Sequence, residues 1–185
     1  MKRVLEALIS LLGLMVTSPL MIALIPIIRL TSAGPAFFCQ ERVGRQRKTF
    51  ICYKLRTMAD GTPQAGTHEV SAASVTPIGR FLRKTKLDEL PQLWNVLLGE
   101  MSLVGPRPCL PSQQDLIEER EKRGVFGVLP GITGLGQVRG IDMSVPHRLA
   151  ECDAEYVENQ SLWLDFRLII QTVLGAGRED RVKTA

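Results

Sequence analysis

The sequence is poor in aromatic residues and has no Cys/His cluster of the kind that binds zinc. Aromatic residues make up 5% of the 185 residues and do not alternate with basic residues, as they do in proteins that stack nucleic-acid bases. The four cysteines are far apart, and no Cys-x-x-Cys motif or Cys/His cluster occurs. No P-loop and no internal repeat is present. These absences argue against a nucleic-acid partner, a zinc site and a P-loop nucleotidase, and they fit reduced thiols in a domain that faces the cytosol.

Charge is distributed unevenly along the chain. Residues 1–107 contain 14 Lys/Arg and 7 Asp/Glu, a net charge of +7, whereas residues 108–185 contain 9 and 12, a net charge of −3. The basic part also contains the longest apolar run. This combination indicates contact with anionic lipid head groups or phosphorylated ligands.

The apolar run lies between Glu6 and Arg29 and contains 22 residues without a charge. As a helix it is roughly 33 Å long, close to the ~30 Å hydrocarbon thickness of a bilayer. Ser18 and Pro19 lie in its middle, where proline removes a hydrogen bond and a serine hydroxyl can satisfy the freed carbonyl. Basic residues flank the run on both sides, as expected when both ends are cytoplasmic. The residues leave two topologies open: a kinked span, or a re-entrant helix–break–helix that enters and leaves one leaflet.

The remaining chain predicts one domain with an α+β, mainly helical fold. We expect a membrane anchor over residues 1–30, a catalytic domain over 31–177 and a polar tail over 178–185. Extended stretches at Ala36–Gln40 and Thr49–Leu55 predict a β-hairpin with Gly44 in its turn. Further helices are expected after a Thr76 N-cap, from near Asp88, over the charged stretch 115–123 behind a capping box at Ser112, and from Ser144 to Asn159.

Two further segments admit more than one interpretation, and two others are expected to be solvated. The apolar segment 161–175 is either a core helix or an amphipathic helix on the bilayer, where Trp163 would be favourable. Four glycines in residues 129–140 could let backbone amides approach an anion, or could build turns. His68 lies alone in a loop rich in Gly, Thr and Ser, and is expected to be solvated. The charged stretch 115–123 is expected to be a solvated helix face.

The chemistry centres on the adjacent carboxylates Asp88 and Glu89. Pro91 follows closely, which predicts a helix start here and makes capping the simplest role for the pair. An ionised carboxylate among cations could also be a metal ligand or a nucleophile.

Four basic residues surround this pair as candidate phosphate ligands. Lys54 and Arg56 alternate with apolar residues at the end of the second strand, either as a solvated face or as anion contacts. Arg83 precedes the pair, and the stiff turn around Arg107 and Pro108 presents a guanidinium suited to phosphate. Cations, carboxylates and a membrane segment together fit phosphoryl transfer to a lipid phosphate.

Several sequence blocks resemble the bacterial sugar transferases, the monotopic phosphoglycosyl transferases. They are the Ser-Pro pair in the apolar run, SAGPAFFCQERVG, KTFICYKLRTM, LRKTKLDELPQLWNVLLGEMSLVGPRP, LPGITGLGQVRG and YVENQSLWLDFRLI. The resemblance extends from about Lys2 to Thr172 and is similar to the minimal form of the family. DELPQL and VGPRP are its most specific parts.

The resemblance implies a reaction at the cytoplasmic face of the bacterial inner membrane. The family transfers a sugar 1-phosphate from a UDP-sugar to a polyprenyl phosphate, usually undecaprenyl phosphate, and releases UMP. This is the first membrane step of glycoconjugate assembly, so later enzymes of the pathway are possible partners. The lipid bilayer is the other expected partner.

The resemblance also implies roles for individual residues. Asp88 is the expected nucleophile and the expected Mg²⁺ ligand, and Glu89 is the second member of the catalytic pair. Lys54, Arg56, Arg83, Arg107 and Pro108 are the expected substrate-binding set. Ser18 and Pro19 match the family's helix-breaking pair, which favours the re-entrant topology.

This sequence departs from the family pattern at Lys86 and Glu100, where serine and aspartate are common. Neither departure removes a catalytic position, and the sugar remains open. Two other functions compete with the transferase: a catalytically silent scaffold at the membrane surface, and a Mg²⁺-dependent hydrolase of lipid pyrophosphates.

Overall fold

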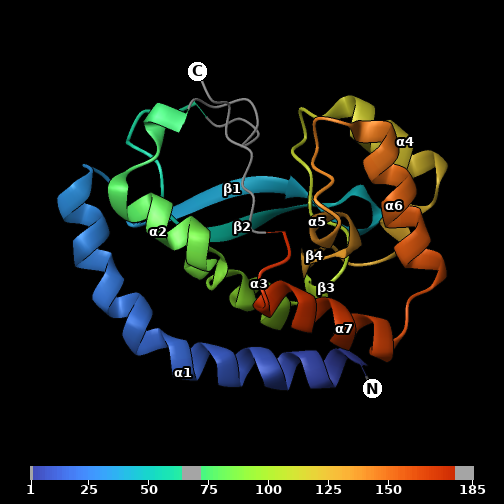
Figure 1. Cartoon of the computed structure of the whole chain (residues 1–185), viewed down its shortest axis with the longest axis horizontal. Coiled ribbons are helices and arrows are strands. Elements are labelled where there is room, and N and C mark those ends of the chain that lie inside the picture. Colours follow the sequence, from blue (N-terminus) through green and yellow to red (C-terminus); the bar gives the residue numbers. More distant parts are fainter. Residues whose placement is uncertain (1, 64–71, 178–185) are drawn as a thin grey trace.

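The computed structural model describes residues 2–63 and 72–177. Seven α-helices surround two small sheets in these residues (Figure 1). The helices are α1 (Lys2–Thr31), α2 (Pro77–Thr85), α3 (Gln92–Leu98), α4 (Gln114–Lys122), α5 (Leu135–Val138), α6 (Pro146–Glu158) and α7 (Leu162–Val173). The strands are β1 (Phe37–Val43), β2 (Thr49–Leu55), β3 (Ser102–Val104) and β4 (Gly131–Thr133). The predicted α+β, mainly helical fold is therefore confirmed.

The hairpin of β1 and β2 lies at the centre of the molecule. The strands pair antiparallel from Phe37 opposite Leu55 to Val43 opposite Thr49, with Gly44 in the connection, as predicted. The second sheet is the parallel pair of β3 and β4. Figure 1 shows α1 and α2 on one side of the hairpin, and α4 and α6 on the other.

Helix α1 is continuous, so the predicted break of the helix at Ser18 and Pro19 is wrong. The helix runs unbroken through Pro19 and Pro26 and curves along the outside of the molecule (Figure 1). Pro19 cannot donate to the carbonyl of Met15, and the hydroxyl of Ser18 donates to that carbonyl instead, at 3.1 Å. The serine thus limits the cost of the proline, and the helix bends without ending.

The N-terminal end of α1 is fixed to the domain by polar side chains. Arg3 donates to the carbonyls of Val96, Leu97 (3.1 Å) and Met101 (3.3 Å) at the end of α3. Lys2 forms an ion pair with Asp165 of α7 at 2.7 Å. Arg3 thus adds donors to carbonyls at and just after the end of α3, and Lys2 connects α1 to α7.

The C-terminal end of α1 returns to the same domain through apolar contacts. Leu24 and Ile28 are buried with Leu55 of β2 and Leu82 of α2 in one cluster. Both ends of the apolar helix are therefore bound to one folded unit.

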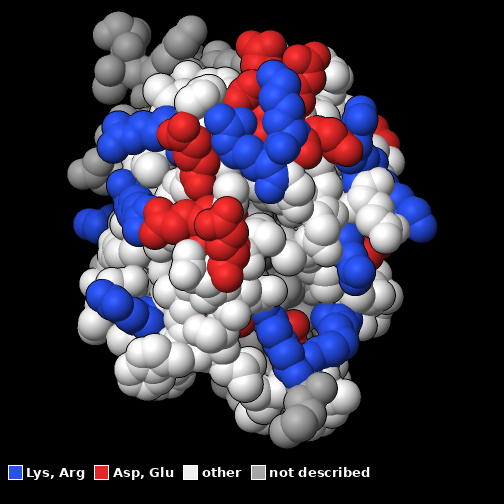
Figure 2. Space-filling model, turned by 90° about the vertical axis from the view of Figure 1, so that its right-hand side faces the viewer, with Lys and Arg blue, Asp and Glu red and all other residues white. Residues whose placement is uncertain are grey.

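Between its bound ends, α1 exposes apolar side chains. The helix is long and apolar enough to cross a membrane, and only 11% of its most apolar window is buried. Helices α3 and α7 add Trp94, Leu98, Trp163 and Phe166, each more than half exposed. Figure 2 shows most acidic side chains of one face on its upper part, while the lower part is largely uncharged apart from a few basic groups. The molecule thus has one apolar side.

Several predictions for the helices are confirmed and one is wrong. Helix α2 begins behind Thr76, whose hydroxyl accepts from the amide of Gly79 at 3.0 Å, as predicted. Helix α6 ends at Glu158, one residue before the predicted end. The capping box predicted at Ser112 is absent from α4, because its N-cap residue is Gln113, whose side chain accepts from the amide of Leu110 instead.

Helix α7 combines the two environments that the sequence left open. Leu168 is 1% exposed and packs in the core, while Trp163 is 73% exposed. The ring of Trp163 stacks with that of Phe166 at 6.0 Å between centroids. One face of α7 is therefore core and the other is an uncovered apolar surface.

Candidate active site

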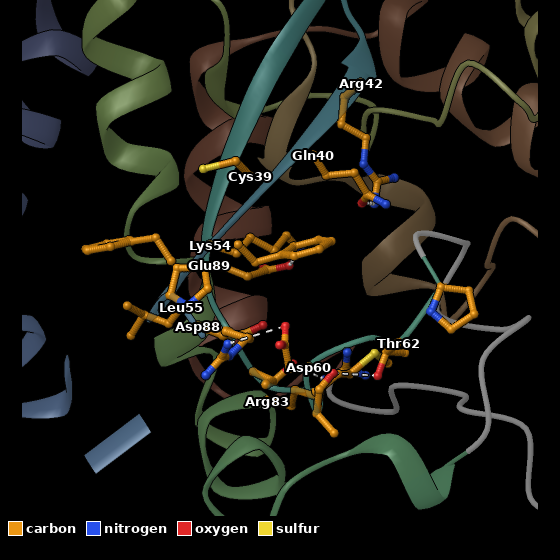
Figure 3. Close-up of a pocket in the computed structure, with 18 of the residues that line it drawn as sticks. Cys39, Gln40, Arg42, Lys54, Leu55, Asp60, Thr62, Arg83, Asp88 and Glu89 are labelled. Atoms are coloured by element: carbon orange, nitrogen blue, oxygen red, sulfur yellow. Dashed lines mark hydrogen bonds and ion pairs between the residues drawn. The ribbon is translucent and has the colours of Figure 1, made fainter. Parts of the chain in front are cut away.

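The predicted site residues converge on a cavity of about 620 Å³ between the hairpin, α2 and the turn that precedes α3. Its lining includes Lys54, Arg56, Arg83, Asp88, Glu89 and Arg107. Figure 3 shows Asp88 and Glu89 beside each other, with Lys54 close to Glu89 and Arg83 close to Asp88. Six of the seven residues proposed for catalysis and substrate binding are thus brought together, although they come from four separate parts of the chain.

The two carboxylates lie in a 3₁₀ turn over Leu87–Glu89, and not in the first turn of an α-helix as predicted. Helix α3 begins at Gln92, with Pro91 as its N-cap residue. Lys86 precedes the turn in the left-handed conformation, with φ of 60°. This backbone reversal turns Asp88 and Glu89 inward, and each is 7% exposed.

Glu89 is held between two cations. Its Oε1 accepts from Lys54 Nζ at 2.8 Å and from Arg107 Nη2 at 2.7 Å. Burial alone would raise the pKa of Glu89, but the charges of Arg107, Lys54 and Lys86 outweigh burial and hold this pKa well below its usual range. Glu89 is therefore an anion at neutral pH, and it orients two cations toward the cavity.

Asp88 lines the same cavity. Arg83, from the last turn of α2, also lines the cavity and is positioned by a hydrogen bond from its Nε to Thr57 Oγ1 at 2.8 Å. Close packing at Gly79 fixes the position of α2 against the hairpin, because a Cβ at Gly79 would lie 1.9 Å from the carbonyl oxygen of Thr57. Any side chain there would push α2, and with it Arg83, away from the hairpin.

Arg56 and Pro108 contribute less directly than the sequence indicated. Arg56 is buried, and its Nη2 donates to the carbonyl of Ser32 at 2.6 Å, while Nη1 lies 4.0 Å from Asp60. It therefore ties the end of α1 to the cavity wall. Pro108 is not among the lining residues, and its carbonyl accepts from Arg42 at 3.0 Å.

Sequence reasoning missed Gln40 and Arg42, which line the cavity from β1. Arg42 Nη2 donates to Gln40 Oε1 at 2.5 Å. Burial lowers the pKa of Arg42 to about 10, and the nearby charge of Arg107 adds to this effect. The predicted hairpin could have revealed both residues. Phe38 pairs with Lys54, and side chains on a strand alternate between its two faces, so residues 38, 40 and 42 lie on the same face as Lys54.

A second missed group supports the turn that carries Arg107. Arg120 is 1% exposed, and its Nε and Nη2 donate to Asp153 Oδ2 at 2.9 and 2.6 Å. Its Nη1 donates to the backbone carbonyl of Arg107 at 2.9 Å. The prediction that the charged stretch 115–123 is only a solvated face is therefore wrong for Arg120.

The glycine-rich segment 129–140 builds turns against the turn that contains Gly105. A Cβ at Gly131 would lie 2.0 Å from the amide nitrogen of Gly105, and a Cβ at Gly134 would lie 2.2 Å from its carbonyl oxygen. These close approaches favour the packing interpretation of the glycines over an anion-binding one.

The remaining candidates lie outside the site or outside the described residues. His68 and the tail 178–185 belong to the parts that the structure does not describe. Cys52 and Cys109 are buried, and burial raises the pKa of both thiols, which keeps them protonated. Within residues 2–63 and 72–177, no three His, Cys, Asp or Glu side chains are grouped as a ready-made metal site.

Fold and site together define a class of protein. It is an enzyme whose cavity is rich in cations, as phosphate chemistry requires, and lies next to an apolar surface. The family model described as bacterial sugar transferase matches residues 1–178. The chain therefore belongs to the bacterial sugar transferase family of phosphoglycosyl transferases.

The chain is similar to several curated relatives. It is 39% identical over 173 residues to the sugar transferase EpsL of Bacillus subtilis, covering 94% of this chain and 85% of that protein. It is 38% identical over 182 residues to the UDP-glucose:undecaprenyl-phosphate glucose-1-phosphate transferase of Caulobacter vibrioides, covering 93% of this chain and 68% of that protein. It is 36% identical over 182 residues to the UDP-N-acetylgalactosamine-undecaprenyl-phosphate N-acetylgalactosaminephosphotransferase of Aeromonas hydrophila, covering 93% of this chain but 42% of that protein.

Proposed function

We propose that this chain transfers a sugar 1-phosphate from a UDP-sugar to a polyprenyl phosphate, with release of UMP. The observation that carries the proposal is the placement of Asp88 and Glu89 in one cavity with Lys54, Arg83 and Arg107. The names of the Caulobacter and Aeromonas relatives support both substrate classes. A bilayer-bound acceptor also agrees with the apolar side of the molecule.

The first half of the reaction is attack by Asp88 on the β-phosphorus of the UDP-sugar. A carboxylate oxygen forms a bond to phosphorus, the bond to the bridging oxygen breaks, and UMP leaves with the electron pair. A carboxylate is a weak nucleophile in water but serves when it is positioned in line and cations neutralise the phosphate. Arg83, Lys54 and Arg107 are the cations that the cavity offers.

In the second half, an oxygen of the polyprenyl phosphate attacks the phosphorus of the aspartyl intermediate. The acyl phosphate bond breaks, Asp88 is regenerated, and a polyprenyl-diphosphate-sugar is released. In this scheme Glu89 is a positioning residue, because it holds Lys54 and Arg107 while remaining ionised itself.

Magnesium is the proposed cofactor, and the donor set fits it. Mg²⁺ is usually bound by one or two carboxylates together with substrate phosphates and water, rather than by an all-protein cage. Asp88 supplies one carboxylate in the cavity, and Glu89, which binds Lys54 and Arg107, lies beside it. When bound, the ion would neutralise phosphate charge, and Asp88 is the residue that would hold it.

A re-entrant topology at the cytoplasmic face of the inner membrane is the proposed placement. It is supported by the two ends of α1, which both contact the same domain, whereas a spanning helix would leave that domain at one end. The exposed apolar face of α7 would then lie on the bilayer. A cysteine added before Lys2 should be labelled only from the cytoplasmic side by a membrane-impermeant maleimide; labelling from the periplasmic side would contradict this topology.

The test of function is UMP release from a panel of UDP-sugars in the presence of polyprenyl phosphate. We expect Asp88→Asn to lower the rate at least about 1,000-fold, because the nucleophile is lost. Asp115→Asn is the matched control, since Asp115 is an exposed aspartate in the first turn of α4. Full activity in Asp88→Asn would exclude the covalent route, and release of inorganic phosphate would indicate a hydrolase instead.

A further inference from the structure

A second, smaller cavity adjoins the proposed active site. It has a volume of about 120 Å³ and shares two lining residues, Lys86 and Glu89, with the large cavity. Its other lining residues are Leu90, Leu93, Ile132, Thr133, Gln137, Thr172, Ala176 and Gly177. The two cavities therefore meet at the turn that carries the carboxylate pair.

The small cavity is suited to an apolar group and not to a nucleotide. Pockets for drug-sized ligands are typically about 300–1,000 Å³; the large cavity falls within this range and the small cavity falls below it. Three side chains that form its walls are the apolar Leu90, Leu93 and Ile132. The hydroxyls of Thr133 and Thr172 bond to each other at 2.6 Å, and Thr172 also donates to the carbonyl of Leu168 at 2.9 Å, so neither hydroxyl has a proton left to donate to a ligand.

The small cavity adjoins the apolar anchor. Leu93, one of its lining residues, also packs on α1, where a Cβ at Gly13 would lie 3.1 Å from Leu93 Cδ1. Residues around Gly13, including Leu12 and Val16, are 62% and 70% exposed on the apolar side of the molecule. One leucine thus lies between the apolar surface and the carboxylate turn.

Lys86 places a positive charge where the cavities meet. Its side chain has no hydrogen bond or ion pair with any residue in the described part of the chain. Its left-handed backbone, with φ of 60°, is sparsely populated by lysine and is held by hydrogen bonds at the end of α2. A phosphate at this junction would contact Lys86 on one side and the large cavity on the other.

The geometry points to the small cavity as the subsite for the first isoprenoid unit of the lipid acceptor, with its phosphate at the junction beside Lys86. This inference rests on the proposed function and deepens it. The tail would approach from the apolar side along α1 and α3, while the nucleotide uses the large cavity. The phosphate would then lie next to Asp88 without the lipid having to pass through the nucleotide site.

Filling the cavity tests this assignment. We expect Leu93→Trp to raise the KM for polyprenyl phosphate roughly tenfold, by excluding about two methylene groups from burial. The KM for the UDP-sugar should change by less than about twofold. Leu98→Trp adds the same aromatic to an exposed position of the same helix and is the matched control.

A short, water-soluble acceptor separates the subsite from the membrane. With a water-soluble two-unit isoprenoid phosphate supplied to the protein in vesicles, Leu93→Trp should show the same increase in KM, because the first unit is still present. An increase seen only with long acceptors in vesicles would place the effect on the bilayer surface and overturn the assignment.

A second variant guards against misfolding of the first. Ile132→Phe fills the cavity from β4 and should reproduce the selective increase, with thermal unfolding confirming the fold of each variant. Equal increases for both substrates, or no increase for either, would refute the subsite. Absence of UMP release by the unmodified protein with both substrates would instead refute the proposed function itself.

Discussion

Two buried carboxylates, Glu89 in the cavity and Asp153 in the core, differ in how strongly neighbouring cations oppose the effect of burial on the pKa. Glu89 contacts both Lys54 and Arg107, whereas Asp153 contacts Arg120 alone. Burial raises the pKa of Asp153, although Arg120 opposes this, while the several cations around Glu89 overcome burial and lower its pKa. The opposite charges of Arg120 and Asp153 balance each other, and both side chains are buried away from solvent. The cavity, in contrast, carries more positive charge than Glu89 neutralises. That excess is what a diphosphate requires.

The two groups are also connected. Arg120 bonds the carboxylate of Asp153 and the carbonyl of Arg107, so the core pair supports the backbone that presents a cavity cation. The contrast between a structural pair and a functional cluster therefore makes separate predictions for stability and for activity.

The largest expected effect concerns stability. Asp153→Asn should lower the free energy of unfolding by about 3–5 kcal/mol, because Arg120 would be left as a buried charge without a counterion. Glu89→Gln should cost less than half as much, since Lys54 and Arg107 can contact water in the cavity. Denaturant unfolding in detergent micelles measures both, and equal losses would contradict the distinction.

The next effect concerns activity. Arg107→Lys keeps the charge but loses the planar fork, and should reduce UMP release about 10- to 100-fold with little change in stability. Arg139→Lys is the matched control, because Arg139 forms a two-point ion pair with Glu155 on the surface. If both substitutions behave alike, Arg107 is not a substrate contact.

A smaller effect is expected when the core pair is replaced as a unit. The double variant Arg120→Met with Asp153→Leu removes both charges, so its stability should stay within about 2 kcal/mol of the original. The carbonyl of Arg107 would lose its donor, and the rate should fall about three- to tenfold. An unchanged rate would show that Arg120 does not position Arg107.

The smallest effect is a pH dependence of opposite sign for the two acids. The lowered pKa of Glu89 contributes stability that is present above its unfolded value of about 4.3 and is lost as pH falls through the folded value. The raised pKa of Asp153 has the opposite effect. Above the pKa of Asp153 in the folded state, ionisation of this buried group lowers stability, and this loss disappears as pH falls toward its pKa in the unfolded state, about 3.9. Melting temperatures from pH 3 to 7 should show that Glu89→Gln flattens the acid-side loss, while Asp153→Asn does not.

Much of the fold and most of the site could be predicted from the sequence because local rules carry them. The alternation in Thr49–Leu55 and the cap-proline pair at Thr76 depend on neighbouring residues alone, and the structure bears out both. The cluster around Asp88 and Glu89 was found because its members lie in recognisable blocks.

The missed features are those that depend on contacts between distant segments. Arg120 lies in a run of charges that looks solvated, and only the packing of α4 on α6 brings Asp153 beside it. The continuity of α1 through Pro19 was missed because it depends on whether one serine hydroxyl satisfies one carbonyl. The side-chain hydrogen bond of Ser18 stabilises a curved helix where the sequence suggested a break.

The two bound ends of α1 have a practical consequence for handling this protein. Removing the helix to obtain a water-soluble fragment would expose the carbonyls at the end of α3 that Arg3 satisfies, and would remove Leu24 and Ile28 from the apolar cluster beside β2. The anchor is thus a wall of the domain as well as its attachment, and trimming it would yield an incomplete fold rather than a free enzyme.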